Sequence, residues 1–360
     1  ACMTTPLLQL EGVTKHYPIK KGMILQRQVG SVRAVDGIDL TLMPGETLAV
    51  VGESGCGKST TARLAMRLIE PTAGTIRYDG EDVTRASKAG LRKLRREVQI
   101  VFQDPYASLN PRMTIEELIA EPMLVNHVGD ADSRRARVRE LLRLVDLAPH
   151  HAASYPHEFS GGQRQRIGIA RALSVSPRLI VCDEPVSALD VSIQAQIVNL
   201  LKDLQKDFGL SYLFISHGLA VVKHMADRVA VMYLGEVVEI ADKASLYANP
   251  RHPYTQALLA AAPEPDPAQR QARPMLGGDV PSPANPPPGC RFHTRCTFAA
   301  DKCKTDAPAL RPIASGHNVA CHFAETIPAF DRFSRVGAAT PQLQKRLALY
   351  RQHREKAAAE

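Results

Sequence analysis

The sequence predicts an α/β fold in which a mixed sheet forms the core, a helical subdomain is inserted and a cysteine-containing extension follows. Short apolar or β-branched runs alternate with longer amphipathic segments in the first part of the chain, as strands and helices do in this class. Between Phe102 and Leu179 only helical spacing is found, and prolines crowd the chain after Pro263. We expect this division: a domain over 1–262 with its helical subdomain at about 104–178, a proline-rich linker over 263–289, a four-cysteine module over 290–323 and a basic tail over 324–360.

Composition narrows the class of protein. The 360 residues are 44% hydrophobic and 23% charged, ordinary globular proportions that exclude a collagen-like, coiled-coil or wholly disordered chain. The net charge of +8 indicates an acidic partner, and it does not choose among a nucleotide, a nucleic acid and an anionic membrane surface. Because no stretch approaches the roughly 18 apolar residues of a membrane span and no signal-peptide pattern opens the chain, we expect a cytoplasmic protein that forms no pore by itself.

Short apolar runs are the expected strands of the sheet. They cover residues 48–51, 98–102, 179–182, 212–215 and 229–232. Most of them end beside a motif that carries chemistry. Within the insert, Ser133 is suited to cap a helix whose apolar face is formed by Val138, Leu141, Leu142 and Val145.

A glycine-rich segment follows the first expected strand and precedes a helix, and it matches the phosphate-binding loop of P-loop NTPases. Glycines allow the backbone to curl so that successive N–H groups face the phosphates, to which the helix adds its positive N-terminal end. Lys58 is expected to reach the β- and γ-phosphates, and the Ser59 hydroxyl to bind Mg²⁺. The residues expected to bind ATP here are Gly52, Glu53, Ser54, Gly55, Cys56, Gly57, Lys58, Ser59 and Thr60.

Two carboxylates end the apolar run at 179–182. A buried strand that delivers Asp183 to the edge of a parallel sheet can hold Mg²⁺, directly or through water, beside the phosphates. Glu184 is suited to act as the general base that orients and deprotonates the water attacking the γ-phosphorus. Alone, an Asp-Glu pair is usually a solvated strand end, so the assignment depends on its co-occurrence with the phosphate loop.

A second anion-binding helix N-terminus is expected between the phosphate loop and the acidic strand, although one domain needs only one such site for a γ-phosphate. It is formed by Ser160, Gly161, Gly162 and Gln163. In this position the segment resembles the signature sequence of ATP-binding cassette (ABC) proteins. The resemblance implies the P-loop ABC ATPase fold, ATP hydrolysis, and a signature that closes over ATP held by a partner domain.

Further residues match the ABC pattern in family order. The resemblance implies that Gln103 meets Mg²⁺ and the attacking water, that His217 contacts the γ-phosphate and that Tyr17 stacks on adenine. His217 is followed by Gly218, where close relatives usually carry an aspartate, which puts the contacts of that loop in doubt. A further segment resembles the loop that runs along the dimer interface in this family: Ser187, Ala188, Leu189 and Asp190.

Two longer segments, 103–112 and 251–259, resemble the ATPases of bacterial dipeptide and oligopeptide importers, most of all the F-type subunits of dipeptide permeases. The resemblance implies a heterodimer with a sister ATPase, two membrane permease subunits, an extracytoplasmic peptide-binding protein and a place on the cytoplasmic face of the bacterial inner membrane. Related systems carry glutathione, nickel complexes or wall peptides, which are the alternative substrates. A nucleic-acid-associated ABC ATPase is a further alternative. The inserted coiled coils or second cassette of that class are not evident, so no nucleic acid is expected as partner.

Four cysteines crowd the C-terminal stretch, separated by five, six and seventeen residues: Cys290, Cys296, Cys303 and Cys321. Four thiolates suit one tetrahedral zinc or one [4Fe-4S] cluster. Zinc ribbons favour cysteines paired two to four apart, so the wider spacing favours the cluster, which the resemblance implies for some peptide-importer ATPases; zinc and free thiols are the alternatives. We expect the cluster to staple the extension rather than to perform chemistry, with a redox-responsive regulator as a less favoured hypothesis. Nearby alternative ligands are His293, His317 and His322.

Overall fold

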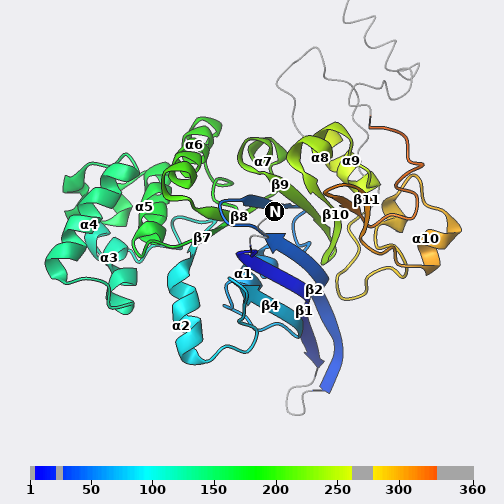
Figure 1. Cartoon of the computed structure of the whole chain (residues 1–360), viewed down its shortest axis with the longest axis horizontal. Coiled ribbons are helices and arrows are strands. Elements are labelled where there is room, and N and C mark those ends of the chain that lie inside the picture. Colours follow the sequence, from blue (N-terminus) through cyan, green and yellow to red (C-terminus); the bar gives the residue numbers. More distant parts are fainter. Residues whose placement is uncertain (1–4, 22–26, 262–278, 331–360) are drawn as a thin grey trace, which may run out of the picture.

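A computed structural model gives the structure of residues 5–21, 27–261 and 279–330 (Figure 1). Two sheets occupy its centre, one of four strands in the order β2-β1-β4-β5 and one of eight in the order β11-β12-β10-β9-β3-β8-β7-β6. The helical subdomain lies at one end of the molecule and the cysteine-containing extension at the opposite end. The nucleotide motifs therefore lie between two structurally different appendages.

The larger sheet contains every strand expected from the sequence. Five neighbouring strands run parallel: β9 (Arg228–Tyr233), β3 (Thr47–Val51), β8 (Ser211–Ser216), β7 (Leu179–Asp183) and β6 (Val98–Val101). Their apolar residues are almost all buried, because helices pack on one face of the sheet and a helix together with the smaller sheet packs on the other. The expected strands are confirmed, with ends that differ by one residue at most.

A smaller antiparallel sheet was not predicted. It consists of β1 (Leu8–Lys21), β2 (Arg27–Leu42), β4 (Ala73–Tyr78) and β5 (Glu81–Asp82). β1 pairs with β2 from Leu8 opposite Leu42 to Lys21 opposite Arg27, with several register shifts. Polar residues interrupt the apolar alternation of both long strands, which hides them from a search for short apolar runs.

Helices cover the sheets and form the insert. Around the sheets lie α1 (Lys58–Ala65), α2 (Lys88–Glu97), α6 (Val191–Phe208), α7 (Leu219–Met225), α8 (Lys243–Ala248) and α9 (Pro253–Ala261). The insert holds α3 (Ile115–Val125), α4 (Ala131–Leu144), α5 (Gly161–Leu173) and the 3₁₀ turns Pro149–Ala153 and Pro156–Glu158. Across the described ranges, no helix is both long and apolar enough to cross a membrane.

The expected cap of α4 is wrong by three residues. Asp130 is the N-cap, its Oδ1 accepts from the Ser133 N–H at 2.8 Å, and the Ser133 hydroxyl accepts from the Asp130 N–H at 2.8 Å. Both residue types cap well, and the reciprocal pair places serine at the third helical position. The expected apolar face is correct, since Val138, Leu141 and Leu142 are fully buried.

The C-terminal extension joins the larger sheet. A 3₁₀ turn (His293–Arg295) and α10 (Asp301–Thr305) precede the hairpin of β11 (Arg311–Ala314) and β12 (His317–Val319). β12 pairs with β10 (Glu236–Asp242) through Val319 opposite Glu239. The predicted basic tail from 331 onward and the first part of the predicted linker, to residue 278, lie outside the described residues.

Candidate nucleotide-binding site

The phosphate loop connects β3 to α1 along a path that requires glycine. Gly52 and Gly57 have positive φ angles of 155° and 109°. A Cβ atom at Gly52 would lie 2.2 Å from the Met232 carbonyl oxygen, and one at Gly57 would lie 2.2 Å from that of Ala34. The loop is thus enclosed by β9 and β2, and only residues without a side chain fit there.

Lys58 is buried beneath this loop. Its Nζ donates to the carbonyl oxygens of Gly52 and Glu53, at 2.9 Å each. The ammonium group therefore closes the loop on itself, and it also lines the adjoining cleft with Ser59 and Thr60. Together with the N-terminal end of α1, this places positive charge where an anionic group would bind.

An open cleft of about 500 Å³ lies over the loop, large enough for a nucleotide. Six of the residues predicted to bind ATP line this cleft: Ser54, Gly55, Gly57, Lys58, Ser59 and Thr60. Sequence reasoning missed the other wall, formed by Val32, Ala34 and Pro283. No motif marks these three residues, and Pro283 reaches the cleft because its carbonyl accepts from the Arg33 N–H at 3.0 Å.

Four predicted residues do not line the cleft. Gly52 and Cys56 are enclosed, and burial raises the pKa of the Cys56 thiol, which suits a small core residue. Glu53 points to the C-terminal extension, as described below. Tyr17 is 39% exposed, with the Lys15 Nζ 5.1 Å from its ring centre. Stacking of Tyr17 on adenine remains a prediction.

Ser59, which lines the cleft, is hydrogen-bonded to the buried Asp183. The Ser59 hydroxyl donates to Asp183 Oδ1 at 2.9 Å, although the two residues lie far apart in the sequence. Burial raises the pKa of Asp183, against the hydrogen bond from Ser59, so a cation beside it would favour its ionised form. A hydroxyl and a carboxylate oxygen are ligands that Mg²⁺ prefers, so this pair fits the ion.

Glu184, Gln103 and His217 form one hydrogen-bonded group at the cleft. Glu184 Oε2 accepts from Gln103 Nε2 at 3.0 Å and lies 3.1 Å from His217 Nδ1. Glu184 has φ of 49°, in the left-handed region that costs a side-chain-bearing residue conformational energy. Its N–H donates to the Ile215 carbonyl oxygen at 3.0 Å, which ties this residue, just after β7, to the neighbouring strand β8. Three residues predicted from separate strand ends are thus brought together.

The signature segment lies away from this cleft. Ser160 caps α5 and exchanges hydrogen bonds with Gln163, and neither residue lines the cleft. The predicted interface loop connects the two regions: the Ser187 hydroxyl donates to the Glu184 carbonyl oxygen at 3.1 Å, and the Leu189 side chain would touch a Cβ placed on Gly161 at 3.5 Å. The N-terminus of α5, of the kind that binds anions, is therefore separate from the nucleotide cleft.

Gly218 is not required by space. A Cβ there would meet only ordinary contacts, the nearest being the Ser216 hydroxyl oxygen at 3.6 Å. Gly218 is the N-cap of α7 and offers no side-chain cap. Space for a Cβ is thus available, and the departure from the family pattern leaves this position without a carboxylate.

The segment 251–259 supports the phosphate loop from behind. The Glu53 N–H donates to the Tyr254 hydroxyl at 2.8 Å, and Tyr254 is fully buried against Tyr233, with ring centres 4.7 Å apart. Glu239, also fully buried, accepts from the N–H groups of Arg251 and His252 at 2.7 and 3.0 Å. Sequence reasoning noted this segment only as a family likeness, which gave no physical role for its tyrosine.

The four C-terminal cysteines line a single small cavity, with Phe292, Phe298 and Phe323 among its other walls. Burial raises the pKa of Cys290, Cys296 and Cys321 to about 11, and the Cys290 N–H donates to the Cys303 carbonyl oxygen at 2.9 Å. In the described ranges, no three His, Cys, Asp or Glu side chains are placed as ligands of one metal ion. His293 and His322 line the cavity, whereas His317 is held by Glu239 at 2.7 Å and does not.

Comparison with known proteins agrees with this geometry. The ABC transporter family matches residues 35–187, and the family described as the oligopeptide/dipeptide transporter C-terminal region matches residues 238–303. The chain is 54% identical over 320 residues to a probable peptide ABC transporter ATP-binding protein, y4tS, of Sinorhizobium fredii, covering 89% of this chain and 90% of that protein. It is 54% identical over 319 residues to the oligopeptide transport ATP-binding protein AppF of Bacillus subtilis, covering 88% and 97%.

Among solved structures, the dimeric ATP-binding cassette MJ0796 bound to ADP and phosphate superimposes with a TM-score of 0.57 at 30% identity, covering 66% of this chain and 98% of that one. The chain belongs to the ATP-binding proteins of ABC transporters, in the group that carries the oligopeptide/dipeptide transporter C-terminal region.

Proposed function

We propose that this chain is the ATP-hydrolysing subunit that powers import of di- and oligopeptides through a membrane ABC transporter. The observation that carries the proposal is the group of Gln103, Glu184 and His217 at a cleft floored by a phosphate loop. The C-terminal family match and the relatives named for peptide transport support the substrate class.

ATP and Mg²⁺ are the cofactors expected of an ABC ATPase. Ser59, Asp183 and Gln103 would hold the ion, and the ion would neutralise charge that develops on the phosphates. Lys58 and the loop N–H groups would bind the β- and γ-phosphates. Glu184 would accept a proton from the attacking water, oriented by Gln103, while His217 would contact the γ-phosphate.

A second ATPase chain would complete the site. The signature at Ser160 lies away from the cleft of its own chain, so it is free in the described structure to cover ATP on a partner. We propose a heterodimer with a sister ATPase, bound beneath two permease subunits on the cytoplasmic face of the inner membrane, with an extracytoplasmic peptide-binding protein supplying substrate. Closure on ATP and reopening after hydrolysis would drive the permeases between two states.

The cysteine module would hold a [4Fe-4S] cluster. The cysteines are separated by five, six and seventeen residues, a wider spacing than the two to four that zinc ribbons favour. The four thiols line one small cavity, and four thiolates are the ligand number that a [4Fe-4S] cluster takes. The cluster would stabilise an extension that buries only a small apolar cluster of its own, formed by Val319, Cys321, Ala324 and Ile327.

The test is ATPase stimulation in the complete complex. The chain is purified with its permeases, sister ATPase and binding protein, and ATP hydrolysis is measured against di-, tri- and pentapeptides, glutathione, a nickel complex and a wall peptide. We expect stimulation by one or more of the short peptides. Stimulation by glutathione, the nickel complex or the wall peptide alone would overturn the proposed substrate, and stimulation by DNA or RNA would overturn a transport role.

A further inference from the structure

The cysteine module contributes two buried arginines, each adjacent in sequence to one of the four cysteines. Arg291 follows Cys290 and Arg295 precedes Cys296, and their side chains are only 8% and 4% exposed. A buried guanidinium group is costly unless acidic or carbonyl oxygens satisfy it. Both arginines find such partners in the cassette domain.

Arg295 binds the phosphate loop. Its Nη1 and Nη2 donate to the two carboxylate oxygens of Glu53 at 2.7 and 3.0 Å, in a two-point contact, and Nη1 also lies 3.4 Å from the Tyr233 hydroxyl. Such a two-point contact fixes the orientation of the carboxylate and also balances its negative charge. Glu53 belongs to the loop that must bind a polyphosphate, so its carboxylate would repel the ligand if it were unpaired.

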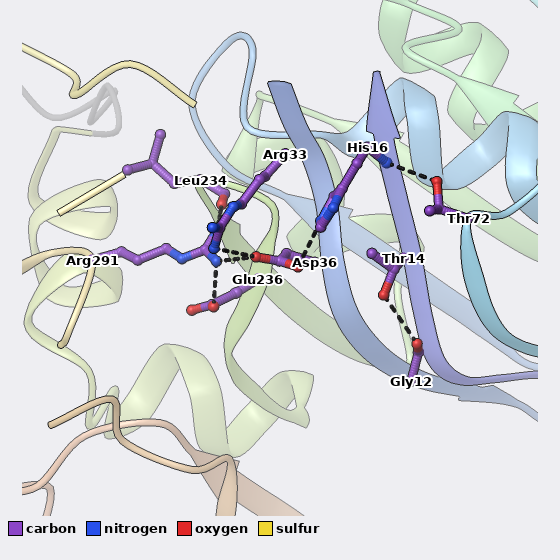
Figure 2. A network of polar contacts seen from close by, with 9 residues as sticks. All are labelled: Gly12, Thr14, His16, Arg33, Asp36, Thr72, Leu234, Glu236 and Arg291. Atoms are coloured by element: carbon purple, nitrogen blue, oxygen red, sulfur yellow. Dashed lines mark hydrogen bonds and ion pairs between the residues drawn. The ribbon is translucent and has the colours of Figure 1, made fainter. Parts of the chain in front are cut away.

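Arg291 binds β2, the strand that forms part of the other wall of the cleft, and Figure 2 shows its polar contacts. It contacts Asp36 on β2, donates to the Leu234 carbonyl oxygen and lies 2.8 Å from Glu236 Oε1. The Asp36 Oδ1 atom also lies 2.8 Å from His16 Nε2. Although burial disfavours the Asp36 anion, hydrogen bonds from Arg291 and His16 bring its pKa below the ordinary value.

Strand β2 contains both Asp36, which Arg291 contacts, and a residue that lines the nucleotide cleft. Asp36 lies two residues beyond Ala34, whose side chain lines the cleft and whose carbonyl oxygen packs against Gly57 of the phosphate loop. His16, the second partner of Asp36, directly precedes Tyr17. The two arginines thus reach both walls of the cleft from the far side, without lining it themselves.

We propose that Arg291 and Arg295 are positioning residues of the ATP site, through which the cysteine module holds both walls of the cleft in their binding geometry. Arg295 neutralises and orients Glu53, and Arg291 holds β2 through Asp36. The inference rests on the ATP site and not on the transported substrate or on the group that the thiols bind. ATP affinity is therefore expected to depend on residues that never touch ATP.

The test measures equilibrium binding of ATP to the full chain and its variants. Arg295→Gln is expected to weaken binding about tenfold, because it leaves an unpaired carboxylate, that of Glu53, on the loop that binds the phosphates. The double variant Arg295→Gln/Glu53→Gln removes that carboxylate and is expected to regain most of the affinity. Arg291→Gln is expected to weaken binding as well, through β2.

Arg311→Gln is the matched control. Arg311 lies in the same module and makes a similar two-point contact at an exposed position, with Glu325 just beyond the module, and it also donates to the Cys321 carbonyl oxygen at 3.4 Å. It is expected to leave ATP affinity unchanged. Equal weakening by Arg311→Gln would show a general loss of the module's structure and overturn the proposal, as would wild-type affinity in Arg295→Gln or a double variant as weak as the single one.

Turnover at saturating ATP and a conservative variant of Arg295 distinguish a positioning role from a general loss of structure. Turnover of the assembled transporter at saturating ATP is expected to stay within about twofold of wild type in Arg295→Gln, because the arginine touches no reacting atom. If Arg295→Gln does not fold, Arg295→Lys retains the charge and loses the two-point geometry, and it is expected to bind ATP with intermediate affinity. Unchanged affinity in a folded Arg295→Lys together with lost turnover would overturn the positioning role.

Discussion

Glu184→Gln removes the proposed base and keeps nearly everything else in the cleft. The amide oxygen of glutamine can still accept from Gln103 Nε2, now 3.0 Å from the carboxylate, and the side chain has the same length. An amide cannot take a proton from water. General-base catalysis typically contributes 10²–10⁴-fold, which is about 2.7–5.5 kcal/mol in the activation free energy.

The assay is phosphate release by the assembled transporter at saturating ATP, paired with equilibrium binding of ATP. Turnover is expected to fall at least about a hundredfold, with affinity within about twofold of wild type. Glu81→Gln is the matched control, since Glu81 is exposed and pairs with Lys93 away from the cleft. Turnover within a few-fold of wild type in Glu184→Gln would refute the role of Glu184.

Three other changes are expected to have distinct effects. Lys58→Ala removes the buried ammonium of the phosphate loop and should weaken ATP binding by about 3 kcal/mol, or about a hundredfold, in the same binding assay; near-normal affinity would contradict its phosphate role. Cys303→Ser should lower the iron and sulfide content of anaerobically purified protein and its melting temperature, whereas Cys182→Ser, in buried β7, should keep the iron; colourless wild-type protein with stoichiometric zinc would contradict the cluster. Asp130→Ala should lower the melting temperature by about 1–2 °C and Asp130→Asn by less, because asparagine still caps α4; equal losses would argue against the cap.

The parallel core of the fold was predictable from local sequence, for a physical reason. Strands buried on both faces are continuous apolar runs, so residues such as those of β7 and β8 are visible without any knowledge of their partners. The half-exposed strands β1 and β2 carry lysines, arginines and threonines among their apolar residues. Their pairing with each other makes them strands, and that pairing is not local.

The same distinction separates the predicted and the missed parts of the site. Motif residues such as Lys58 and Glu184 stand in patterns dictated by phosphate and water chemistry, so their types and spacing are visible in the chain. Arg295 reaches Glu53 across 242 positions of sequence, and Pro283 reaches the cleft through a backbone hydrogen bond. Neither contact leaves a local pattern.

Peptide uptake driven by ATP is the most direct measurement of the central claim. The complete complex is reconstituted in proteoliposomes with its binding protein and a labelled dipeptide on one side and MgATP on the other. Uptake is expected to require ATP and to be lost with Glu184→Gln in this chain. Undiminished uptake by the Glu184→Gln complex, or steady ATP hydrolysis by the wild type without movement of any peptide tested, would contradict the account.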